Sequence, residues 1–286
     1  MKIALTARQR RLSLVFAVAG ITALPLAWRG TSCGHDFDFH LESWLEVVRH
    51  WREGVLYPHW AESPNYGAGE PRFVFYPPFS WMLGALLSLF MPWIRVPLVF
   101  TMVALGLMGA SFFRMAREWI PEGNASLAAC VYVANPYVLF VAYERAAYGE
   151  LLAAAWLPLL VLFALRCARS KEGKPSQNEV SKGHGFSRAV NRSKENRALA
   201  PEGNRFRSKP MLALAAVIAG LWLTNAPAAV MGCYGLAIIV VVAALTERRW
   251  ALILRAVGGT ALGLALAGFY LVPAICEQRW VEIQRA

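Results

Sequence analysis

The 286-residue chain is 57% hydrophobic and 16% charged, with a mean hydropathy of +0.40, whereas soluble domains carry about 45–50% apolar and about 25% charged residues. This composition excludes an ordinary soluble enzyme, and five cysteines are too few for a secreted disulfide scaffold. The net charge of +11 would suit a nucleic-acid-binding protein, but +8 of it lies between Arg166 and Lys209, in a polar insert between apolar runs. Basic segments beside membrane spans are typical of cytoplasmic loops, so we expect no nucleic-acid partner.

The N-terminal segment predicts a membrane span that is retained in the protein. Basic residues precede an apolar run over residues 12–28, as in a signal peptide, but no small-x-small cleavage site follows. We therefore expect a first span with a cytoplasmic N-terminus, which delivers the polar and aromatic residues 29–76 to the outside.

The remaining apolar runs fix the predicted topology. They cover residues 77–94, 96–113, 125–142, 151–165, 211–225, 228–245 and 250–275. If every run crossed, the basic insert would lie outside, against the positive-inside rule. The run 77–94 is bounded by prolines and holds only about 14 good apolar residues, so we expect it to lie at the outer surface.

The sequence thus predicts an all-α, polytopic transmembrane helical bundle of about seven spans, in a single transmembrane domain of the cytoplasmic (inner) membrane. Its parts are the first span at 12–28, an extracytoplasmic loop with interfacial helices at 29–95, spans 2–4 within 96–165, a disordered basic cytoplasmic loop at 166–210, and spans 5–7 within 211–275.

Within the outer loop, residues 41–56 predict an amphipathic helix. Its apolar residues follow three- and four-residue spacing, and Glu46 belongs to the face that we expect to be polar. Such a helix would lie flat in the interface, with Trp44 and Trp51 at the depth of the lipid headgroups.

The segment just before that helix gathers two carboxylates and two imidazoles in six residues, from His35 to His40. If it is extended, Asp36, Asp38 and His40 share one face; if it is helical, Asp36 and His40 meet at i, i+4. Either arrangement suits a general base with a tuning partner or a divalent metal site. The alternative is a charged helix start with Asp38 as its N-cap.

A second feature is the glycine-rich and aromatic stretch 65–78, which contains Tyr76. Glycines allow close backbone approach, and tyrosine suits a ligand that is sugar at one end and lipid at the other. The alternative is an ordinary aromatic belt at the membrane surface.

A third feature lies between two apolar runs, at 135–137 and 143–150. Ionisable residues at a membrane boundary usually have partners. The planar guanidinium of Arg145 suits a phosphate or a carboxylate, and Glu144 or Glu150 can pair with it. The alternative is a simple salt bridge within a loop.

The order of these features resembles that of the polytopic membrane glycosyltransferases of the C-type fold (GT-C). The resemblance is nearest to bacterial membrane proteins labelled 6-pyruvoyl-tetrahydropterin synthase-related, a label that implies no pterin chemistry here. It covers nearly the whole chain outside residues 168–209. The matching positions are His35-Asp36 with His40, Pro58-His59-Trp60, Gly67-Ala68-Gly69-Glu70-Pro71, Tyr76-Pro77-Pro78, Tyr143-x-Arg145, Glu150 and Phe269-Tyr270-Leu271-Val272-Pro273 with Glu277.

The resemblance implies transfer of a sugar, with inversion, from a polyprenyl-phosphate donor to a lipid, protein or glycan acceptor outside the membrane. Asp36, or secondly Asp38, would act as the base or help to hold a divalent metal such as Mg or Mn, for which Asp36 and His40 are the candidate ligands. The residues that would bind the donor phosphate or the substrate are His35, His40, Tyr76, Tyr143, Arg145 and Glu150. Relatives of this kind are usually longer, so we expect a truncated member.

Two alternatives from other classes remain. A transporter or flippase-like protein would keep ionisable groups near the midplane of its spans, whereas here the spans are nearly free of charge. Helix breakers at Pro136, Pro158 and Pro227, inside or beside apolar runs, nevertheless fit transport. The short chain also fits a non-catalytic remnant.

Overall fold

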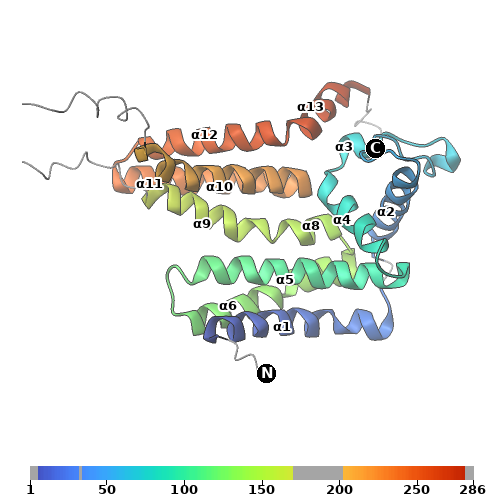
Figure 1. Cartoon of the computed structure of the whole chain (residues 1–286), viewed down its shortest axis with the longest axis horizontal. Helices are drawn as coiled ribbons and strands as arrows, with labels where there is room; N and C mark the ends of the chain where they lie inside the picture. The colour runs from blue at the N-terminus through green and yellow to red at the C-terminus, as the bar shows by residue number, and fades with distance from the viewer. Residues whose placement is uncertain (1–5, 32–33, 170–201, 281–286) are drawn as a thin grey trace, which may run out of the picture.

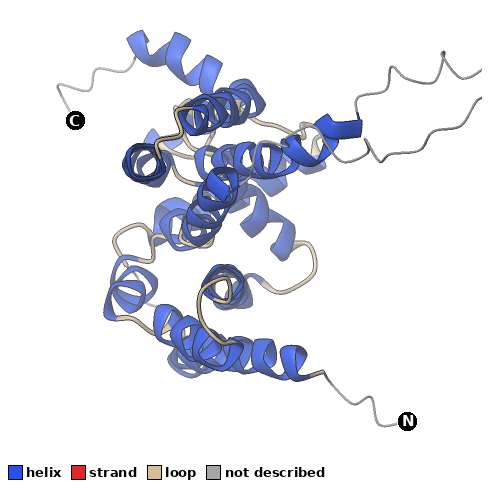
Figure 2. Ribbon diagram, turned by 90° about the vertical axis from the view of Figure 1, so that its left-hand side faces the viewer, coloured by secondary structure: helices blue, strands red, loops and turns tan. Residues whose placement is uncertain are grey.

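The computed structural model describes residues 6–31, 34–169 and 202–280, with the backbone alone for 202–208 and 280. Throughout this part of the chain the regular structure is helical, apart from one isolated antiparallel bridge between Ala61 and Glu70 (Figures 1 and 2). The all-α class expected from the apolar runs is confirmed.

Long helices alternate with short ones along the chain. The helices of the bundle are α1 (Ala7–Arg29), α5 (Val96–Ala116), α6 (Glu122–Val133), α9 (Trp156–Arg169), α10 (Glu202–Thr224), α11 (Ala226–Glu247) and α12 (Ala251–Leu266). The short elements are α2 (Phe37–Arg52), η1 (Asn65–Gly67), α3 (Arg72–Phe75), α4 (Pro78–Ser88), η2 (Trp93–Arg95), α7 (Pro136–Leu139), η3 (Phe140–Arg145), α8 (Tyr148–Ala153), α13 (Gly268–Glu277) and η5 (Gln278–Trp280).

Five helical stretches of the described chain are long and apolar enough to cross a membrane. They are Ala7–Arg29, Trp93–Ala116, Glu122–Arg145, Tyr148–Arg169 and Ala226–Glu247. A sixth is added if α12 and α13, which are bent by 75° at their junction, form one broken span. The apolar part of α10, Lys209–Thr224, is shorter, as is α4. The structure therefore supports a polytopic helical bundle with five or six candidate spans.

The long helices form two packed groups. One group contains α1, α5 and α6, the other contains α9, α10, α11 and α12, and α5 packs against α9 between them (Figure 1). Figure 2, viewed from one end, shows several of these helices nearly end-on. At the other end of the bundle lie α2, α3, α4 and α13 (Figure 1), which we call the cap end.

The predicted helix at 41–56 needs three corrections. It begins earlier, at Phe37, and ends at Arg52. Trp44 is fully buried and stacks on Phe100 with ring centroids 5.4 Å apart, so its ring packs in the protein core and is not exposed to lipid headgroups. Glu46, expected on the polar face, is only 3% exposed. The reason for both burials is that α2 is covered on one side by α4 and on another by the chain that returns after it.

The predicted disordered loop at 166–210 is also corrected at both edges. The helix α9 continues to Arg169, and the helix α10 already begins at Glu202. Residues 170–201, which make up most of the prediction, lie outside the described residues.

Candidate functional site

The connection between α1 and α2 is fastened to the end of η3. The backbone N–H of Asp36 donates to the carbonyl oxygen of Arg145 at 2.9 Å. Gly34 approaches the same segment so closely that a Cβ there would lie 2.6 Å from the carbonyl oxygen of Glu144. Only glycine fits such an approach, and the contact places the Asp36 side chain beside that of Arg145, 109 residues further along the chain.

The segment that carries Arg145 has unusual backbone geometry. Residues Phe140–Arg145 form a π-helical turn, which ends at Ala146 with a left-handed φ of 52°. Such turns are rare and are frequently found at functional sites. The chain then enters α8 at Tyr148, which places Glu150 in the first turn of that helix.

An ionic chain runs across this junction. Arg145 donates through Nη2 to Asp36 Oδ2 at 3.2 Å and through Nη1 to Glu150 Oε2 at 2.7 Å. The other oxygen of Glu150 accepts from the hydroxyl of Tyr137, and His35 Nδ1 lies 2.6 Å from Asp36 Oδ1. The side chains of Asp36, Arg145 and Glu150 are each between about a quarter and two fifths exposed, so water and ligands reach them.

Four members of this ionic chain, His35, Asp36, Arg145 and Glu150, line a cavity of about 360 Å³ at the cap end. Six residues expected at the site from the sequence line it: His35, Asp36, His40, Tyr76, Arg145 and Glu150. The sequence did not single out Ser80, Trp81, Thr224 and Asn225, which also line it. A signal for Asn225 was available, because an asparagine just before Ala-Pro is a typical helix N-cap, and its side chain does cap α11 by accepting from the N–H of Ala228.

His40 is an uncharged member of this cavity. Burial lowers the pKa of His40 to about 4. The negative charge of Asp36 opposes this shift, and the positive charge of Arg72 adds a smaller lowering. The imidazole ring meets Tyr148 edge-on, with centroids 5.4 Å apart. At neutral pH the ring is therefore neutral, and it offers the cavity a hydrogen-bonding group without a charge.

Two residues expected at the site lie elsewhere. Asp38 is exposed, in the first turn of α2, and is not part of the cavity lining. Asp36, not Asp38, occupies the N-cap position of α2, and its side chain makes no capping bond. Tyr143 also lies away from the lining, because its hydroxyl donates to the carbonyl oxygen of Thr22 in α1.

The pair Asp36 and His40 does not fit a divalent metal. Among the described residues, neither belongs to a group of three possible ligands close enough to surround an ion. Since Mg and Mn prefer several oxygen ligands around one point, this donor set gives no basis for a metal-dependent step.

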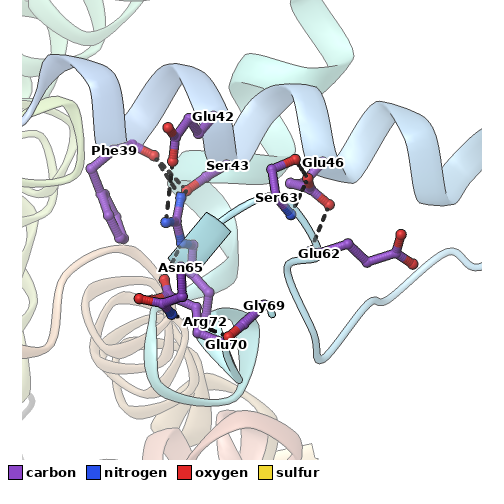
Figure 3. A network of polar contacts seen from close by, with 10 residues as sticks. All are labelled: Phe39, Glu42, Ser43, Glu46, Glu62, Ser63, Asn65, Gly69, Glu70 and Arg72. Carbon is purple, nitrogen blue, oxygen red and sulfur yellow. Dashed lines mark hydrogen bonds and ion pairs between the residues drawn. The ribbon is translucent and has the colours of Figure 1, made fainter. Parts of the chain in front are cut away.

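A buried arginine that the sequence did not single out holds the cap together (Figure 3). The side chain of Arg72 is 5% exposed and donates to Glu70 at 2.6 Å, to Glu42 at 3.3 Å and to Ser43 at 3.2 Å. It also bonds the carbonyl oxygen of Phe39 at 3.3 Å and lies over the ring of the same residue. Arg72 therefore joins α3 to the first turns of α2, directly behind the cavity.

Two apolar grooves adjoin the cavity. The larger, of about 1410 Å³, lies between α3 and the α12–α13 bend and shares Phe39 and Tyr76 with the cavity. The smaller, of about 620 Å³, lies between α9 and α11 and shares Arg145 and Glu150. The ionic chain therefore lies where a polar cavity meets a groove lined mainly by apolar side chains.

Comparison with protein-family models, with curated proteins and with solved structures finds no match for this chain.

Proposed function

We propose that the protein is a membrane glycosyltransferase that moves a sugar from a polyprenyl-phosphate donor to a hydroxyl acceptor outside the cytoplasmic membrane. The observation that carries the proposal is the junction of Asp36, Arg145 and Glu150 in one cavity. An acid, a cation and a second acid thereby stand together at the end of an apolar groove.

The smaller groove suits the lipid part of such a donor. It runs from Glu150 along α8 and α9 to Val161, which corresponds to about 16 Å of helix at 1.5 Å per residue. On the α11 side its wall includes two glycines, Gly232 and Gly235, which leave room for a chain. A hydrocarbon tail in this groove would place its phosphate beside Arg145, the cation at the polar end.

The bond lengths around Arg145 suggest how a phosphate enters. The bond to Glu150 is shorter, at 2.7 Å, than the bond to Asp36, at 3.2 Å. An incoming phosphate competes for the guanidinium and replaces the weaker partner. Asp36 is then released as a free carboxylate next to the reacting groups, while Glu150 and Tyr137 keep Arg145 in place.

The reaction follows from these positions. Asp36 removes the proton from the acceptor hydroxyl, whose oxygen attacks the anomeric carbon of the sugar. The bond from that carbon to the phosphate oxygen breaks on the opposite face, so the configuration is inverted. The electron pair of the broken bond stays on the phosphate, where Arg145 stabilises the added negative charge.

The proposal also implies how the chain is oriented in the membrane. The cap end faces outside. Seven segments cross the membrane: α1, η2–α5, α6–η3, α8–α9, α10, α11 and the bent pair α12–α13. The opposite end, with the N-terminus, faces the cytoplasm. Support comes from the chain direction, because Arg114 and Arg117 at the end of α5 and Arg249 after α11 then lie on the cytoplasmic side, as the positive-inside rule requires.

The test compares two acids that the sequence alone does not separate. Membranes that contain the protein are supplied with a labelled polyprenyl-phosphate sugar, and transfer is measured for wild type, Asp36→Asn and Asp38→Asn. Loss of a general base costs about 10²–10⁴-fold in rate, so Asp36→Asn should fall into that range while Asp38→Asn stays within about twofold of wild type. Equal transfer by wild type and Asp36→Asn rejects Asp36 as the base.

A further inference from the structure

A second cluster of ionisable groups lies at the far end of α2. His50 and Glu53 lie one helical turn apart, and Glu62 belongs to the chain that returns along α2. One possible ligand atom from each lies within 4.8 Å of the other two, which is true of no other such group among the described residues. About 21 Å of helix, from Asp36 to His50 at 1.5 Å per residue, separates this cluster from the cavity.

The imidazole of His50 presents a nitrogen lone pair to the cluster. His50 is 9% exposed, and its Nε2 lies 2.9 Å from the carbonyl oxygen of Trp60. Because a carbonyl oxygen only accepts, Nε2 carries the hydrogen and Nδ1 of the neutral ring carries the lone pair. Nδ1 lies 4.0 Å from Glu53 Oε2, which is beyond hydrogen-bonding distance. Histidines that bind metals usually donate their second ring N–H in this way.

Both carboxylates are oriented by the protein. Arg49 contacts Glu53 through Oε1 at 3.5 Å, which leaves Oε2 on the side of His50, and it contacts Glu62 Oε2 at 2.5 Å. The backbone N–H of Glu62 donates to the buried carboxylate of Glu46 at 3.1 Å, and the Glu62 side chain extends away from it (Figure 3). Two carboxylates beside one guanidinium leave an excess negative charge for a cation.

We propose that His50 Nδ1, Glu53 and Glu62 bind a divalent transition-metal ion of the zinc class. Zn²⁺ accepts both imidazole nitrogen and carboxylate oxygen as ligands, and its open sites combine three protein ligands with water in the fourth position, whereas Mg²⁺ prefers oxygen ligands alone. The two carboxylates are about half exposed, so they can turn to close the 4.8 Å spacing around an ion. The ion would join the end of α2 to the returning chain and would leave the cavity at Asp36 untouched.

The experiment measures binding of the metal alone. The full chain is purified in detergent, stripped with EDTA and titrated with Zn²⁺ by calorimetry, and the same site is examined with Co²⁺ through its visible absorption. Wild type should bind one Zn²⁺ per chain, more tightly than Mg²⁺. His50→Gln keeps an N–H donor for Trp60 but removes the ligand nitrogen, so the affinity should fall by more than the roughly 10–100-fold that loss of an outer-shell partner costs.

The controls separate this site from unspecific binding. His59→Gln removes an exposed imidazole from the same returning segment and should leave the Zn²⁺ affinity unchanged. If His50→Gln does not fold, Glu53→Gln changes an exposed ligand and should lower the affinity in its place. The proposal is overturned if wild type binds no Zn²⁺. It is also overturned if the folded ligand variants bind Zn²⁺ as strongly as wild type does. Neither result bears on sugar transfer, which depends on Asp36.

Discussion

Removal of the Arg72 side chain is the sharpest test of how the cap is held. Arg72→Met keeps the length and most of the apolar volume of the side chain but deletes its ion pairs with Glu42 and Glu70 and its bonds to Ser43 and to the Phe39 carbonyl. These contacts come from two elements, so the substitution should loosen α3 from α2.

The size of the effect follows from burial. A hydrogen bond to a charged group contributes about 1.5–3 kcal/mol, and loss of one partner from a fully buried ion pair costs about 3–5 kcal/mol. Glu42 and Glu70, however, are 50% and 33% exposed, so water rehydrates them once the arginine is gone. We therefore expect a loss of about 2–4 kcal/mol in the free energy of unfolding, at the lower end of the sum of these contacts.

The assay is thermal unfolding in detergent at one fixed scan rate, because membrane proteins often unfold irreversibly. At about 2–4 °C per kcal/mol, the apparent Tm should fall by roughly 4–16 °C. Arg52→Met is the matched control, since Arg52 is an exposed arginine at the end of α2, the helix to which Arg72 binds, and it should shift stability by less than about 0.5 kcal/mol. Equal Tm values for the two variants would show that the Arg72 network does not hold the cap.

Two further predictions concern the cavity itself. Gly34→Ala should lower both the Tm and sugar transfer in the assay above, because the new Cβ would lie 2.6 Å from the carbonyl oxygen of Glu144 and overpacking costs about 1–3 kcal/mol; transfer and Tm equal to wild type would contradict the close contact. The lowered pKa of His40, about 4 against an ordinary 6.5, means that the unfolded chain binds a proton between these pH values while the folded one does not. The free energy of unfolding should therefore fall by about 3 kcal/mol as pH drops from 6.5 to 4. When unfolding is measured at several pH values, His40→Gln should lack this part of the pH dependence.

Much of the helical framework was predictable because each long helix coincides with an apolar run. The short run bounded by prolines became α4, one of the shorter apolar helices. The least predictable part was the cap, where short elements are placed by contacts between distant residues. Arg72 shows why: its partners Glu42 and Ser43 lie about 30 positions earlier, and no local pattern marks a buried cation.

The choice between Asp36 and Asp38 shows the same limit within one segment. The sequence left an extended and a helical arrangement open, and only the extended one put both acids on the same face as His40. In the structure α2 begins at Phe37, so the helical arrangement holds and Asp38 turns out exposed. What fixed the choice was the bond from the Asp36 N–H to the Arg145 carbonyl, between segments that the sequence does not connect.

The first turn of α2 is held at two backbone points, and this decides what a mutation of Asp36 measures. The Asp36 N–H bonds the Arg145 carbonyl, and the Phe39 carbonyl accepts from Arg72. Neither bond uses the Asp36 carboxylate, so both persist when Asp36 is replaced by asparagine. The amide also keeps an oxygen that accepts from Arg145 at the same position. Asp36→Asn therefore removes the negative charge and the basicity while the geometry stays, and a loss of transfer in that variant reports on proton removal and not on a displaced helix.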